Sequence, residues 1–195
     1  FQVFNGWSWD KLYRKDFAER TGLQFQGLRT TNDAFFVYMA SIQAKNITIV
    51  DEILAHHRVN NKAALSVTRE KSWDCCWQAV SAIQQEIKKR NQYEMVEQSF
   101  INWALHFLLW NVHTLKDASK DKLVSEMQNK YFRILELEKY PASFFYSQSE
   151  YKEYQYILKH GNAMQNKTYV IRRVVQHVQE NGLKATVKRI LSKLK

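Results

Sequence analysis

Asp33 is the residue whose type and surroundings are best suited to chemistry. It lies in the stretch Thr31-Asn32-Asp33-Ala34-Phe35-Phe36, near the expected start of a helix. Hydroxyl residues favour the N-cap of a helix, and acidic residues favour its first turn. By its own type, Asp33 is therefore equally compatible with capping a helix and with serving as a reactive carboxylate. The motifs on either side of it favour the second alternative.

A downstream stretch, His56-His57-Arg58, has side chains that can contact a phosphate group. Arginine makes paired hydrogen bonds with phosphate, and a neutral histidine can ligate a metal ion. The two histidines have no carboxylate beside them, so they do not form a metal-site pattern by themselves. A polar strand end that faces water is the other interpretation of this stretch.

Two helices and two short strands are expected to position these residues. The first helix ends at Thr21-Gly22, where glycine suits a helix C-cap, and the second covers residues 32–44. Residues 47–50 have the β-branched composition of a strand, and residues 52–58 are the second strand candidate. The inward face of the first helix is predicted to consist of Leu12, Phe17 and Ala18. Residues 1–65 are thus predicted to form a small α/β portion.

Together these motifs resemble the acceptor-side half of a family 2 glycosyltransferase with the GT-A fold. The core of the resemblance covers residues 7–65, and residues 181–191 are similar to the C-terminal end of many bacterial members. It implies transfer of a sugar from a nucleotide-diphosphate donor to a saccharide or lipid-linked acceptor, in the synthesis of surface polysaccharide or another glycan. The matching segments occur in the family's order and at similar spacing: Trp9-Asp10-Lys11-Leu12-Tyr13-Arg14, Phe17, Gly22-Leu23-Gln24-Phe25, Asn32-Asp33 with Phe36, Ala44-Lys45-Asn46-Ile47, Asp51-Glu52-Ile53-Leu54 and His57-Arg58.

The resemblance also implies roles for individual residues. Asp33 is expected to be the general base that removes a proton from the acceptor hydroxyl. Asn32 stands where the family usually has Glu, and an amide can orient an acceptor by hydrogen bonds but carries no charge. Trp9 and Lys11 are expected near the active cleft, with a core tryptophan and a solvated lysine as the alternatives. The substrate-binding set implied is Trp9, Lys11, Asn32, His57 and Arg58, the last two beside the nucleotide diphosphate.

The donor-binding features of the family do not occur in this sequence. It contains no Asp-x-Asp motif, and no run of alternating strands and helices precedes Trp7. The resemblance implies a divalent metal, Mg or Mn, in the full enzyme, with ligands mostly outside this chain and no metal site within it. We therefore expect this chain to be the C-terminal part of a longer enzyme and to be inactive alone.

The remainder, residues 66–195, is predicted to be a helical C-terminal domain. One apolar stripe consists of Trp73, Cys76, Trp77, Val80, Ile83 and Ile87. Further helices are expected at about 93–114, 120–138, 149–160, 163–180 and 183–195. The adjacent pair Cys75-Cys76 has neither disulfide nor zinc spacing, so small apolar helix residues are the expected role. The predicted fold class is mainly α with a small α/β portion, a GT-A remnant followed by a helical bundle.

The formal net charge of +10 permits several anionic partners. The basic, amphipathic stretch 183–195 suits peripheral contact with an anionic membrane, or a helix docked on the domain with a solvated basic face. Nucleic acid is not expected, because no recognition motif is present. The expected location is the cytoplasm, either free or at the membrane surface. Nucleotide sugar, saccharide acceptor and a second copy of the chain are the expected partners. The alternative function is a non-catalytic helical module for interaction or oligomerisation, served by the tryptophans between Trp73 and Trp110.

Overall fold

The structure, a computed structural model, describes residues 1, 5–53, 55–56, 64–163 and 178. Within these residues the chain forms seven α-helices and four further segments with 3₁₀- or π-helical geometry. Their bounds are α1 Lys15–Thr21, α2 Ala34–Gln43, η1 Leu65–Ser72, α3 Cys75–Lys89, α4 Tyr93–Thr114, α5 Asp117–Glu126, η2 Met127–Tyr131, α6 Phe132–Ile134, η3 Leu137–Lys139, η4 Ala142–Phe144 and α7 Gln148–His160.

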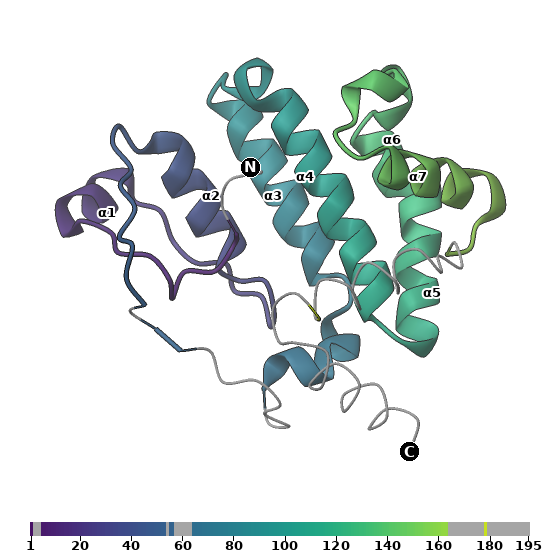
Figure 1. Cartoon of the computed structure of the whole chain (residues 1–195), viewed down its shortest axis with the longest axis horizontal. Helices are drawn as coiled ribbons and strands as arrows, with labels where there is room; N and C mark the ends of the chain where they lie inside the picture. The colour runs from purple at the N-terminus through teal and green to yellow at the C-terminus, as the bar shows by residue number, and fades with distance from the viewer. Residues whose placement is uncertain (2–4, 54, 57–63, 164–177, 179–195) are drawn as a thin grey trace. The chain divides into compact units, whose positions relative to one another are not determined.

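The core is built around α4, which packs against α3, α5 and α7. Figure 1 shows α2, α3 and α4 following one another across the molecule, with α5 to α7 beyond α4. Phe100, Ile101, Ala104 and Leu108 of α4 are fully buried, as expected for a helix that is apolar nearly all round. α3 is amphipathic and turns the predicted stripe inward, with Val80, Ile83 and Ile87 among its buried residues.

The helices on the far side of α4 are joined by an irregular turn. α5 continues through a π-helical turn, η2, into α6. Glu136 then adopts a left-handed backbone with φ 54° and ends the helical run. The single helix predicted over 120–138 is therefore divided. α7 agrees with the predicted 149–160 segment and ends at Gly161, whose φ of 65° is the left-handed C-cap for which glycine is favoured.

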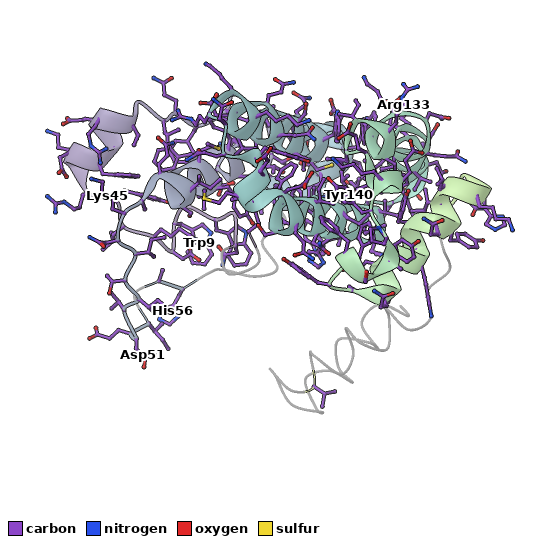
Figure 2. All side chains as sticks on the ribbon, turned by 90° about the horizontal axis from the view of Figure 1, so that it is seen from above. Trp9, Lys45, Asp51, His56, Arg133 and Tyr140 are labelled. Atoms are coloured by element: carbon purple, nitrogen blue, oxygen red, sulfur yellow. The ribbon has the colours of Figure 1, made fainter. Side chains whose placement is uncertain are left out.

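The predicted α/β portion is absent from the described residues: no strand occurs among them, including 47–50. Ile47, Ile49 and Val50 are 52%, 89% and 55% exposed, and this segment extends away from the helical body, as the positions of Lys45, Asp51 and His56 show in Figure 2. A strand requires a partner for its backbone N–H and C=O groups, and the described chain supplies none there. The mainly α class is confirmed, and the strand prediction for 47–50 is wrong.

The first predicted helix also differs from the structure. α1 begins at Lys15 and has no buried residue, and Leu12 lies outside the helix, 91% exposed. Phe17 and Ala18 are half-buried. The predicted inward position of Leu12 is therefore wrong, because the chain before Lys15 forms a loop held by side-chain hydrogen bonds. Gly22 ends α1 with a left-handed φ of 60°, as predicted.

The chain divides into two compact units, Phe1–Ala163 and Met164–Lys195. Residues 183–195, with their predicted membrane contact, and nearly all of 163–180 lie outside the described residues. The predicted domain boundary at residue 65 stays a prediction. Among the helices described, none is long and apolar enough to cross a membrane.

Candidate functional site

Residues 5–11 form a loop whose centre is the Lys11 ammonium group. Its Nζ donates to Asn5 Oδ1 at 3.0 Å, to the Trp7 carbonyl at 2.8 Å and to Asp10 Oδ1 at 2.6 Å. The Trp7 amide also donates to Asn5 Oδ1 at 3.2 Å, and the Lys11 amide donates to the Ser8 carbonyl at 3.3 Å. The side chain of Lys11 is only 18% exposed as a result.

Asp33 lies at the N-cap position of α2, but its side chain makes no capping hydrogen bond. Its Oδ2 instead accepts the Ser8 amide at 3.3 Å, across 25 residues of sequence. The preceding Thr31 has a left-handed φ of 64°, which is unusual for a β-branched residue and costs about 1–3 kcal/mol. The backbone thus turns sharply before Asp33, and the carboxylate serves a tertiary contact in place of a local one.

Trp7 and Trp9 form a stacked pair on the same loop. Their ring centroids are 5.3 Å apart, and the ring planes are inclined by 20°. The two side chains are 49% and 47% exposed, and Trp9 is labelled in Figure 2 beside the helical body. Because Ser8 lies between Trp7 and Trp9 in the sequence, the residue whose amide contacts Asp33 is part of the same short turn.

A third side chain, Tyr13, lies between the loop and α2. Its ring meets Phe36 edge-on at 4.9 Å, and its hydroxyl is buried with no hydrogen-bond partner. Burial, together with the negative charges of Asp10 and Asp33, raises the pKa of Tyr13 to about 12. Tyr13 therefore remains a neutral hydroxyl at physiological pH. It lies close enough to the Asp10 and Asp33 carboxylates for their charges to oppose its ionisation.

Asp10 completes this cluster of polar groups. Burial opposes its ionisation, but hydrogen bonds from Lys11 and Asn5 and the charge of Lys11 hold the pKa of Asp10 below its usual value. Asp10 is thus ionised and committed to Lys11. Among the acidic groups of this cluster, Asp33 is the carboxylate that is not paired with a basic side chain in a described ion pair.

The remaining predicted site residues fall into two groups. Asn32 is exposed, and its carbonyl accepts the Gln26 amide at 3.0 Å. His57 and Arg58 lie outside the described residues, while the adjacent His56 is exposed on the segment that Figure 2 shows extending from the helical body. The structure therefore brings Trp9, Lys11 and Asp33 together, places Asn32 next to Asp33 in the chain, and does not describe His57 and Arg58.

Metal binding has no site in the part of the chain that the structure describes. No group of three or more His, Cys, Asp or Glu side chains lies close enough to hold an ion there. Cys75 and Cys76 are free, buried thiols. The divalent metal that the glycosyltransferase resemblance implies, with ligands mostly outside this chain, stays a prediction.

The tryptophans between Trp73 and Trp110, which would form the contact surface of an interaction module, are mostly buried. Trp77 and Trp103 are 9% and 6% exposed, and Trp73 is half-buried. Trp110 is 38% exposed, but the Arg69 guanidinium lies over its ring at 4.3 Å. These side chains therefore serve mainly as core and do not form an open aromatic surface along α3 and α4.

Three contributors to this site were not singled out from sequence: Trp7, Ser8 and Tyr13. Trp7 and Trp9 are two residues apart, and a repeated aromatic in a short, turn-rich stretch is the signal that could have paired them. Ser8 contacts Asp33 through its backbone amide, so the type of residue at position 8 does not predict this contact. Tyr13 falls within the family-like motif, but its proximity to Asp33 depends on the fold.

Comparison with known proteins gives one partial similarity. A protein of Bacillus subtilis (strain 168) named "Putative glycosyltransferase EpsH" is 25% identical over 130 residues, which make up 64% of this chain and 37% of that protein. The chain therefore spans little more than a third of that relative's length. No family pattern matches the chain, and no solved structure matches it.

Proposed function

We propose that this chain contributes the acceptor side of a glycosyltransferase that uses a nucleotide-diphosphate sugar. The observation that carries the proposal is the position of Asp33: its carboxylate occupies an N-cap site without capping and contacts the Trp7–Trp9 loop. The partial similarity to a named glycosyltransferase supports the same class. The acceptor class that we propose is a saccharide, free or linked to a lipid, in the synthesis of a surface polysaccharide or other glycan.

In the proposed reaction Asp33 is the general base. As an acceptor hydroxyl attacks the anomeric carbon of the donor sugar, its proton passes to the Asp33 carboxylate. The new glycosidic bond forms on the face opposite to the leaving group, the bond to the diphosphate breaks, and the nucleoside diphosphate departs with the bonding electron pair. An inverting transfer needs one positioned base within hydrogen-bond reach of the nucleophile, and Asp33 is the carboxylate that we assign to this role.

The leaving diphosphate requires positive charge, since cationic groups stabilise the anion as it forms. We propose His57 and Arg58 for this role, as the resemblance implies. A divalent metal remains a proposal for the complete enzyme, with ligands outside the described residues. We further propose that this chain alone does not complete the transfer, because the described residues contain neither an alternating strand and helix region nor a cluster of metal ligands.

The proposal is tested by Asp33→Asn in the natural protein that contains this chain. Nucleoside diphosphate release is measured with UDP-glucose, UDP-galactose and UDP-N-acetylglucosamine, in the presence of a crude acceptor extract from the source cells. The expected result is a loss of turnover of about 10²–10⁴-fold, the usual contribution of a general base. Asp16→Asn is the matched control, because Asp16 is an exposed carboxylate of α1 whose ion pair among the described residues is with its near neighbour Arg14. Unchanged turnover in Asp33→Asn would overturn the assignment.

A further inference from the structure

Lys11 has no hydrogen-bond donor left for a substrate. An ammonium group has three N–H donors, and Nζ reaches three acceptors: Asn5 Oδ1, the Trp7 carbonyl and Asp10 Oδ1. The Lys11–Asp10 contact of 2.6 Å is an ion pair whose side chains are 18% and 28% exposed. Direct binding of a substrate by Lys11 would require one of these contacts to break.

The three acceptors of Lys11 are spread along the loop, from Asn5 before the stacked tryptophans to Asp10 after them. Asn5 and the Trp7 carbonyl precede Trp9 in the chain, and Asp10 follows it, so the ammonium holds the two ends of the turn together. Asn5 Oδ1 also accepts the Trp7 amide, so the same side chain orients the first indole. Ser8, inside this turn, donates its amide to Asp33.

Two half-exposed indoles need such a restraint. Stacking at 5.3 Å gains an aromatic contact, but ordering the backbone of an exposed loop costs conformational entropy at every residue. Ordering such a loop takes more than one contact, and the hydrogen bonds of Lys11 join its side chain to three other residues of the loop.

We propose that Lys11 is a positioning residue, which fixes the loop of residues 5–11 so that the Trp7–Trp9 pair forms a platform for a sugar ring beside Asp33. The apolar C–H face of a sugar packs on an aromatic ring, and its hydroxyls hydrogen-bond to carboxylates. The choice of a saccharide as ligand rests on the proposed function. The positioning role itself follows from the contacts of Lys11.

The test uses the natural protein and begins with a spectroscopic readout. Stacked indoles couple their electronic transitions and give a paired positive and negative band in far-ultraviolet circular dichroism. The difference between wild type and Trp9→Phe defines the band of the Trp7–Trp9 pair. Lys11→Met is expected to remove this band to the same extent as Trp9→Phe. Lys15→Met is the matched control, because the Lys15 side chain is 88% exposed and its ion pair among the described residues is with Glu19 in α1, at 3.6 Å.

Asn5→Ala provides a second variant that keeps the lysine. It deletes one acceptor of Lys11 and the partner of the Trp7 amide, and the side chain is exposed, so the core is untouched. It is expected to weaken the coupled band, with an unchanged thermal unfolding midpoint. A band that persists in both Lys11→Met and Asn5→Ala would overturn the positioning role.

Saccharide binding is measured by the change in tryptophan fluorescence with methyl β-D-glucoside, methyl β-D-galactoside and methyl N-acetyl-β-D-glucosaminide. At least one is expected to bind wild type, and Lys11→Met and Trp7→Ala are each expected to raise its dissociation constant about tenfold, as for the loss of one aromatic contact. Binding by none of the three, or equal binding by wild type and both variants, would overturn the platform. The Asp33→Asn experiment tests a different proposal, because it measures sugar transfer and not saccharide binding. Asp33→Asn can lose turnover even if the Trp7–Trp9 pair binds no saccharide, and the pair can bind a saccharide even if Asp33→Asn keeps its turnover.

Discussion

At the scale of single residues, burial decides which reactive groups are available. Asp33 retains a carboxylate that no described ion pair occupies, whereas Lys11 is committed to three acceptors. The thiols of Cys75 and Cys76 are buried at the start of α3. Burial raises the pKa of Cys76 to about 12, so this thiol is protonated at neutral pH.

The cysteines should therefore resist modification in the folded protein. We expect neither thiol to react appreciably with Ellman's reagent at pH 8 under native conditions, because the thiolate is the attacking species and both side chains are covered. Both should react once the protein is unfolded in guanidinium chloride, which provides the internal control. Rapid native reaction of Cys76 would contradict its burial in the core.

At the scale of helices, α4 and α7 are joined by two histidine–glutamate pairs that differ in burial. His113 Nε2 lies 2.9 Å from Glu153 Oε1, with side chains 10% and 4% exposed. His106 Nδ1 lies 2.7 Å from Glu150 Oε1, but the His106 side chain is 59% exposed. The same chemical pair therefore occurs once inside the molecule and once at its surface, between the same two helices.

Removal of the buried partner should be the more damaging change. His113→Leu leaves the Glu153 carboxylate buried without its histidine, and we expect the free energy of unfolding to fall by about 3 kcal/mol. His106→Leu should lower it by no more than about 0.5 kcal/mol, because the exposed pair is screened by solvent. Urea unfolding of the two variants side by side provides the comparison. Equal losses would mean that burial does not govern these contacts.

The surface pair should also make stability depend on pH. The hydrogen bond to Glu150 raises the pKa of His106 above its ordinary value of 6.5, although burial opposes the shift. Its contribution is therefore complete below the ordinary pKa and is lost as pH rises through the higher folded pKa. We expect the stability difference between wild type and His106→Gln to shrink from about pH 6 to about pH 8. A difference that grows over this interval would contradict the direction of the shift.

At the scale of the whole molecule, the helical core and the candidate site are built from different parts of the chain. The core is enclosed by α3, α4, α5 and α7. Helix α2 packs on α3, and the N-terminal end of α2 contacts the loop of residues 5–11. Tyr38 of α2 stacks on Phe1 and packs at a tilt against Trp103, so the helix that bears Asp33 is anchored to α4. Loop geometry near Asp33 thus depends on a rigid helix behind it.

The sequence by itself determined the helices whose apolar pattern is long. α4 begins at Tyr93 and ends at Thr114, as the pattern predicts, and α2, α3 and α7 lie within a few residues of their predicted bounds. Local interactions and a continuous apolar face suffice to specify such helices. The strand predicted at 47–50 failed because a strand depends on a second segment, and β-branched composition alone does not provide one.

Only the tertiary structure decided the character of the candidate site. From its sequence position Asp33 could equally be a helix cap. The contact with the Ser8 amide, 25 residues away, shows what its carboxylate accepts. The same holds for Lys11, whose donors are satisfied by atoms that sequence cannot pair, one of them a backbone carbonyl. The residue types show which side chains can take part in chemistry. Backbone contacts and burial decide which of these side chains stay available to a substrate, because contacts and burial arise from segments that meet only in the folded chain.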